Sequence, residues 1–187
     1  MTMTRISIVV VLLAASQARA DRLRVITGPV PGAPGLVVAA KPDATYCGGT
    51  AVSVVVKSAA GLDPELVAAL TIEAPHDPDS LRAFVTASTA KVQAARELYV
   101  KRAKTDRAAS LARIAQVMRR FAEVMIRFPI PQNVRTGVDA ADNTAAFCEQ
   151  LESVAEPLLT KAEEAAALCR DAGKAAGAGW WNAACAK

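Results

Sequence analysis

Residues 111–128 read LARIAQVMRRFAEVMIRF, and this stretch decides the fold. Its large apolar residues recur at alternating spacings of three and four, the pattern of an α-helix that packs along one face: Leu111, Ile114, Met118, Phe121, Met125 and Phe128. Three arginines lie seven residues apart on the opposite face, at Arg113, Arg120 and Arg127. The stretch therefore predicts a helix with an apolar packing face and an outward basic ridge.

A second amphipathic helix precedes this one. As a single helix, residues 78–128 would be about 75 Å long, which is more than a compact domain of this size can cover. We therefore expect a break near Thr105 or Asp106, both of which are suitable N-cap residues. The two helices are then an antiparallel pair, and Pro129 ends the second of them.

Further helices are predicted on both sides of this pair. The sequence Asp-Pro-Glu at 63–65 opens a helix that Pro75 closes. Residues 140–171 are rich in alanine and helical in pattern, with Pro157 predicting a kink or a new helix start. After a glycine-rich turn, residues 180–186 can form two final helical turns.

Residues 22–61 are less regular than the rest. Two short apolar runs resemble strands, and the proline- and glycine-rich segment 28–35 between them predicts a loop. Residues 51–57 are ambiguous, because their four valines favour a strand whereas Thr50 and Gly61 resemble helix caps. We favour a helix for 51–57, while whether the segment forms a sheet stays open.

The first twenty residues predict export. A short positive n-region, an apolar h-region at 6–15 and the small-x-small sequence Ala18-Arg19-Ala20 form a secretory signal peptide. The apolar run is shorter than the roughly 20 residues that span a bilayer. Removal of this leader lowers the net charge from +4 to +2, so the mature chain is nearly neutral. The expected location is the periplasm or the outside of the cell.

These observations predict a mostly α fold, either a helical bundle or a short stack of helical hairpins with a less regular N-terminal segment. The expected organisation is a signal peptide at 1–20, an irregular segment at 21–61 and a helical domain at 62–187. A mature chain of this length can bury a core without covalent staples.

Four cysteines in an exported chain predict two disulfides: Cys47, Cys148, Cys169 and Cys185. Cys169 and Cys185 flank the glycine-rich turn, so a tight helical hairpin brings them together. Cys148 lies on the same helix as Cys169, about 31 Å away, and cannot pair with it. Cys47 is then the partner left for Cys148.

The C-terminal forty residues carry a pattern of their own. It comprises Phe-Cys-Glu-Gln-Leu at 147–151, Glu-Pro-Leu at 156–158, Cys169, Gly-Trp-Trp-Asn at 179–182 and Cys185. This pattern resembles the C-terminal part of exported bacterial tetratricopeptide-like helical proteins. The resemblance implies stacked helical hairpins that act as binding scaffolds rather than as enzymes. The chain departs from such arrays in showing no clear repeat of about 34 residues.

Catalytic and cofactor motifs are not evident. The single histidine, His76, lies in a linker between two helix starts, and no serine sits in a nucleophile-elbow sequence. No glycine-rich phosphate loop follows a strand, and no CxxC spacing occurs, so we expect neither a cofactor nor a metal. The few aromatic residues of an exported chain argue against nucleic acid as a partner.

The charge is distributed unevenly. Residues 81–135 hold twelve arginines and lysines against three acidic residues, whereas the segments on either side are acidic. One interpretation is that Arg113, Arg120 and Arg127 form a binding face for an anionic lipid, a glycan or an acidic protein. The other is that the ridge is solvated surface, neutralised by the acidic C-terminal helix.

Together these patterns favour an exported helical scaffold or binding module of the cell envelope, which acts through a protein or an anionic ligand. The alternative is an envelope hydrolase whose dispersed site a single sequence does not reveal. A cleft with a perturbed His76 or a carboxylate pair would favour the hydrolase. One apolar or basic groove would favour the binding module.

Overall fold

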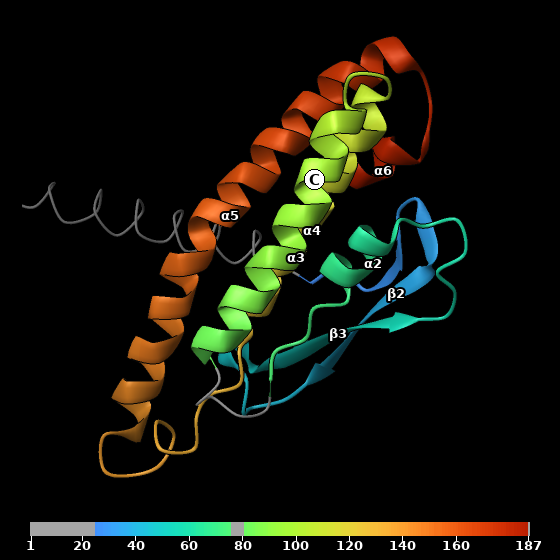
Figure 1. Cartoon of the computed structure of the whole chain (residues 1–187). Coiled ribbons are helices and arrows are strands. Elements are labelled where there is room, and N and C mark those ends of the chain that lie inside the picture. Colours follow the sequence, from blue (N-terminus) through green and yellow to red (C-terminus); the bar gives the residue numbers. More distant parts are fainter. Residues whose placement is uncertain (1–24, 76–80, 187) are drawn as a thin grey trace, which may run out of the picture.

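The computed structural model describes residues 25–75 and 81–186 (Figure 1). The predicted signal peptide and His76 lie outside these residues. The helices are α2 (Pro64–Leu70), α3 (Leu81–Arg102), α4 (Arg107–Ile126), α5 (Ala140–Ala176) and α6 (Trp180–Cys185). The strands are β1 (Gly28–Val30), β2 (Ala33–Pro42) and β3 (Thr50–Val56), with a 3₁₀ turn at Cys47–Gly49. The described chain is therefore mostly α, as predicted, with a small sheet beside the helices.

The sheet is antiparallel, in the order β1-β2-β3. The predicted helix over 51–57 is wrong, because these residues form β3. Neighbouring valines pair across the two strands: Val38 lies opposite Val54, and Val37 lies opposite Val55. Val54 is buried against the helices whereas Val55 is half exposed. The β-branched valines therefore fit a strand with one buried face, and this fit outweighs the resemblance of Thr50 and Gly61 to helix caps.

The predicted loop over 28–35 is instead a hairpin between β1 and β2. Val30 pairs with Ala33, so Pro31 and Gly32 are the two residues of the turn. Gly32 has φ +71°, which is the geometry of the third position of a type II turn with proline before it. The ring of Trp180 in α6 lies directly against Gly32, where a Cβ would overlap it. The turn thus joins the sheet to the C-terminal helix.

Replacing Gly32 with alanine is expected to destabilise the protein by about 2–4 kcal/mol, since it combines a left-handed backbone with an overlap of Trp180. Gly61→Ala is the matched control, because Gly61 has φ +74° and no atom near the added Cβ. Urea unfolding should place the control at about 1–2 kcal/mol. Equal losses in the two variants would show that Trp180 does not pack against the turn.

The predicted break between α3 and α4 is confirmed. α3 ends at Arg102, and the side chain of Asp106 caps α4 by accepting a hydrogen bond from the Ala109 backbone N–H at 3.3 Å. The preceding helix, α2, is shorter than predicted and ends at Leu70 rather than near Pro75.

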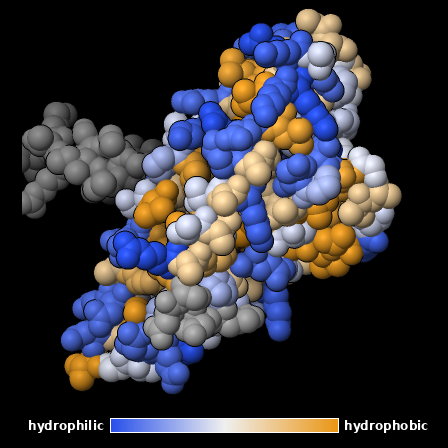
Figure 2. All heavy atoms as spheres, viewed as in Figure 1, coloured by the Kyte–Doolittle hydropathy of each residue, from blue (hydrophilic) through white to orange (hydrophobic). Residues whose placement is uncertain are grey.

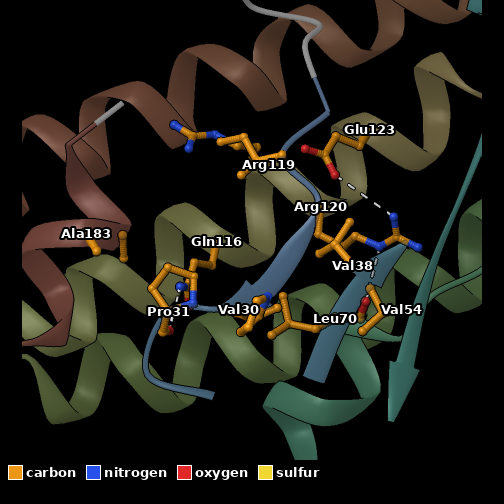
Figure 3. A pocket seen from close by; sticks show the side chains of 13 residues that line it. Val30, Pro31, Val38, Val54, Leu70, Gln116, Arg119, Arg120, Glu123 and Ala183 are labelled. Atoms are coloured by element: carbon orange, nitrogen blue, oxygen red, sulfur yellow. Dashed lines mark hydrogen bonds and ion pairs between the residues drawn. The ribbon is translucent and has the colours of Figure 1, made fainter. Parts of the chain in front are cut away.

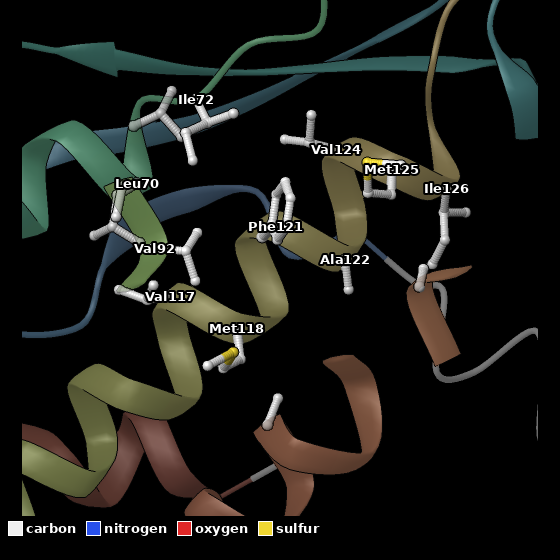
Figure 4. Close-up of a cluster of buried hydrophobic side chains, with 14 of the residues drawn as sticks. Leu70, Ile72, Val92, Val117, Met118, Phe121, Ala122, Val124, Met125 and Ile126 are labelled. Atoms are coloured by element: carbon white, nitrogen blue, oxygen red, sulfur yellow. The ribbon is translucent and has the colours of Figure 1, made fainter. Parts of the chain in front are cut away.

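The central helix of the fold is α4. It packs against α3 and α5 and contacts α2 and α6 as well. Met118, Phe121 and Met125 from the predicted apolar face lie in the core (Figure 4). Fourteen of its 20 residues are buried, so neighbouring elements cover the face opposite the apolar one too. Val30, Leu36 and Val54 of the sheet belong to the same core cluster.

The long helix α5 runs unbroken through Pro157, so the predicted helix restart does not occur. Pro157 and Ser153, four residues earlier, are both exposed, and water can therefore reach the carbonyl that loses its partner. Ala155, Ala162 and Ala166 are completely buried, and small residues of this kind allow α4 to approach closely.

Two disulfides close the structure in the predicted pairing. Cys47 is bonded to Cys148 with a Cα–Cα distance of 5.5 Å, and Cys169 to Cys185 with 6.1 Å. The first joins the segment after β2 to α5, and the second joins α5 to α6. Disulfides of this kind indicate an oxidising compartment. Within the described part of the chain, no helix is both long and apolar enough to cross a lipid bilayer.

Candidate functional site

The three arginines predicted as an outward ridge do not form one. Arg113 and Arg120 are only 7% and 4% exposed, and Arg127 is partly buried. The prediction of an exposed face is therefore wrong for Arg113 and Arg120. These two arginines are buried because α4 is enclosed: the sheet, α2 and α6 cover the face that helical periodicity alone assigns to solvent.

Arg113 holds the hairpin turn. Its guanidinium donates hydrogen bonds to the backbone carbonyls of Pro31 and Gly32 and to the side chain of Gln116. The group also stacks 4.0 Å from the ring centre of Trp180. Burial lowers the pKa of Arg113. These contacts engage the side chain within the molecule, so it is structural.

Arg120 connects α4 to α2 and to the sheet. Its Nε donates to the carbonyl of Leu70 at 3.1 Å, and its Nη2 donates to those of Ile72 at 2.8 Å and Val52 at 3.4 Å. Since α2 ends at Leu70, the guanidinium satisfies carbonyls that the end of a helix leaves unpaired. Its third nitrogen, Nη1, is buried without a hydrogen-bond partner. Glu123 is the nearest carboxylate, with Oε2 4.0 Å from Nη1, too far for a hydrogen bond.

An apolar pocket of about 230 Å³ opens beside Arg120 (Figure 3). Sheet residues Val30, Val38 and Val54 form part of its wall, together with Leu70 of α2 and two alanines of α6. The polar wall comes from α4, as Figure 3 shows: Gln116, Arg119, Arg120 and Glu123. The pocket therefore has an apolar side supplied by the sheet and a charged side supplied by one helix.

A second hollow, of about 270 Å³, lies between the sheet and the C-terminal half of α4. Tyr46, Lys41 and Ser53 line it from the sheet side, and Arg127 lines it from the end of α4. Glu123 lines both hollows, so they meet at this residue. We call the two together the α4–sheet groove. It is apolar at the Val30 end and charged at the Arg127 end.

Glu123 is the central acidic group of this groove. Its side chain is only 19% exposed, and burial raises the pKa of its carboxyl although Arg120, Arg119 and Arg127 act in the opposite direction. Burial also lowers the pKa of Arg120. The carboxylate therefore costs free energy in the folded state that it does not cost in the unfolded chain.

This shift predicts a pH-dependent effect of Glu123→Gln. A carboxyl whose pKa is raised by folding stabilises the protein below its unfolded pKa, and this stabilisation is lost as the pH rises through the folded pKa. The variant lacks the ionisable group, so its stability relative to the native protein should increase from about pH 4 to neutral pH. Urea unfolding of both proteins at several pH values measures this difference. A relative stability that falls with rising pH would show that Glu123 is stabilised as a carboxylate.

A third hollow, of about 410 Å³, lies where α2, α3, α4 and α6 meet, and its polar groups are engaged with one another. Arg102 donates two hydrogen bonds of 2.7 Å to Asp63, and the hydroxyl of Tyr99 donates a third at 2.6 Å. Burial raises the pKa of Asp63, but these hydrogen bonds outweigh it and the net pKa is lowered. This cluster fastens α3 to the start of α2.

Three other candidate features of the sequence are a reactive thiol, a metal site and an exposed basic surface. Cys47 is in a disulfide and offers no thiol. Among the described residues, no cluster of histidine, cysteine, aspartate and glutamate could hold a metal ion. Within residues 81–107, exposed positive charges lie on α3, on the loop after it and at the first residue of α4: Arg82, Lys91, Arg96, Lys101, Lys104 and Arg107.

Comparisons with protein-family models, with curated proteins and with solved structures return no match. The resemblance to tetratricopeptide-like proteins therefore stays a prediction.

The sequence does not mark the groove residues Val38, Val54 and Glu123 as functional residues. Val38 and Val54 are ordinary strand valines, and Glu123 is one acid among many on helix surfaces. Only the pairing of β2 with β3 and their packing on α4 bring them together. One signal was present: Glu123 is the only acidic residue in the stretch 111–128, and arginines surround it.

Proposed function

We propose that this chain is an exported binding module and that it holds its ligand in the α4–sheet groove. The observation that carries this proposal is a pair of hollows between α4 and the sheet that share Glu123 in their lining, one with a mainly apolar lining and the other with a more charged one. Ligand sites are commonly concave, mainly apolar and equipped with a few polar groups. The disulfides fix Cys47, next to Tyr46 of the second hollow, and Cys185, next to Ala184 of the apolar pocket, which supports a preformed site.

The lining of the groove favours binding over nucleophilic catalysis. Around the apolar pocket, the described lining residues include no serine, threonine, cysteine or histidine. Ser53 lines the second hollow, but the lining there includes no histidine to activate it. The proposal that the protein is exported rests on the predicted signal peptide and on the two disulfides.

Amide NMR with a library of small anionic, neutral and cationic compounds tests the proposal. We expect compounds that bind to shift the amide signals of β2, β3 and the second half of α4. Val38→Phe should weaken these responses because it fills the groove from the sheet side. Val37→Phe is the matched control, since neighbouring residues of a strand point to opposite faces. Shifts confined to α3 and α5, or none with any compound, would contradict the proposal.

A further inference from the structure

The two sides of the apolar pocket differ in chemistry. Val30, Val38, Val54 and Leu70 supply methyl groups, and no charged residue lines the pocket on that side (Figure 3). The opposite side is lined by two basic residues, Arg119 and Arg120, and one acidic residue, Glu123. A ligand that fits both sides has an apolar body with a polar group at one end.

The buried Nη1 of Arg120 indicates what that polar group is. A buried charged donor without a hydrogen bond is costly, and Nη1 makes none among the described residues, since Glu123 Oε2 lies 4.0 Å away. The other two nitrogens of the same guanidinium are fixed by backbone carbonyls, so the group cannot turn away to find one. An incoming carboxylate supplies the missing acceptor and forms a charge-assisted hydrogen bond.

Charge and size narrow the class of ligand. Two cationic residues, Arg119 and Arg120, line this wall together with one acidic residue, Glu123, so the formal charge of the wall favours an anion. The volume of about 230 Å³ lies below the range typical of drug-sized ligands. It corresponds to the space of about eight waters at about 30 Å³ each, so it suits a small ligand with a chain of several carbon atoms.

We infer that this pocket binds a small monocarboxylate with an apolar body, such as a medium-chain fatty acid. The carboxylate lies beside Glu123 and accepts a hydrogen bond from Nη1 of Arg120, while the chain packs against Val38 and Val54. This inference rests on the proposed function of the α4–sheet groove and adds the chemistry of the ligand.

Isothermal titration with three eight-carbon probes tests it. Sodium octanoate should bind, and octanol should bind about tenfold more weakly because it lacks the charge-assisted hydrogen bond. Octylammonium, with the opposite charge, should show no measurable binding. Equal affinities for octanoate and octanol would overturn the recognition of a carboxylate.

Three variants locate the binding. Val38→Phe should abolish octanoate binding, whereas Val37→Phe should leave it unchanged. Glu123→Gln removes the one negative charge of the wall at almost constant shape, so it should tighten octanoate binding by roughly three- to tenfold. Weaker binding by Glu123→Gln, or equal binding by the two phenylalanine variants, would overturn the inference.

The outcomes separate this inference from the proposed function. If octanoate fails to bind while other small molecules shift the groove amides, the groove is a binding site for another class of ligand and the inference alone is wrong. If no compound shifts those amides, both are wrong.

Discussion

Replacing Arg120 with methionine is expected to destabilise the protein by about 3–5 kcal/mol. The change removes the donors for the carbonyls of Leu70, Ile72 and Val52, and it leaves Glu123 without the cation beside it. The end of α2 and the edge of β3 then lose their common attachment to α4. Urea unfolding, followed by circular dichroism, measures the loss.

Two comparisons identify the cause. Arg96→Met replaces an exposed arginine of α3 and should change stability by about 0.5 kcal/mol or less. The double variant Arg120→Met with Glu123→Leu should recover part of the loss, because the buried carboxylate no longer stands unpaired. A loss below about 1 kcal/mol for Arg120→Met would show that these buried hydrogen bonds contribute little.

Removal of the Cys47–Cys148 disulfide, by alanine at both positions, should cost about 4–5 kcal/mol, because the bond closes a loop of 101 residues. The bond holds the segment between β2 and β3 against α5. In the same segment the backbone N–H of Cys47 donates to the carbonyl of Phe128, and that of Ile130 donates to the carbonyl of Thr45. These pairs alone are too few to hold the segment firmly.

The second disulfide is the matched control. Cys169 and Cys185 are only 16 residues apart, so their removal should cost about 3 kcal/mol. Urea unfolding of both double-alanine variants in the absence of reductant gives the order. A larger loss for the short loop would mean that the N-terminal segment is held chiefly by its noncovalent contacts.

Local patterns predicted α4, the break before it and the mostly α class correctly. The three-four spacing from Leu111 to Phe128 identifies α4, and Asp106 marks its start because a carboxylate there can satisfy a free backbone N–H. The disulfide pairing followed from helix geometry, since Cys148 and Cys169 are too far apart on one helix. Each of these inferences depends on residues close in sequence or on a rigid element.

The remaining features depend on contacts between distant residues. Residues 51–57 become a strand because β2 is available to pair with them, which their own propensity does not reveal. Helical periodicity predicts which residues share a face but not how many neighbours surround a helix. Arg113 and Arg120 therefore looked exposed, although each donates hydrogen bonds to backbone carbonyls more than 45 residues away. The α4–sheet groove also depends on contacts between segments that are distant in sequence.

The position of bound octanoate tests the account most directly. In protein labelled at its valine and leucine methyl groups, nuclear Overhauser effects from the octanoate chain should reach Val38, Val54 and Leu70, which line the apolar pocket. The half-exposed Val55 lies beside Val54 on β3 but does not line the pocket, and it should show no effect. Contacts to Val55 in place of Val38 and Val54 would place the ligand on the outer face of the sheet and contradict the account.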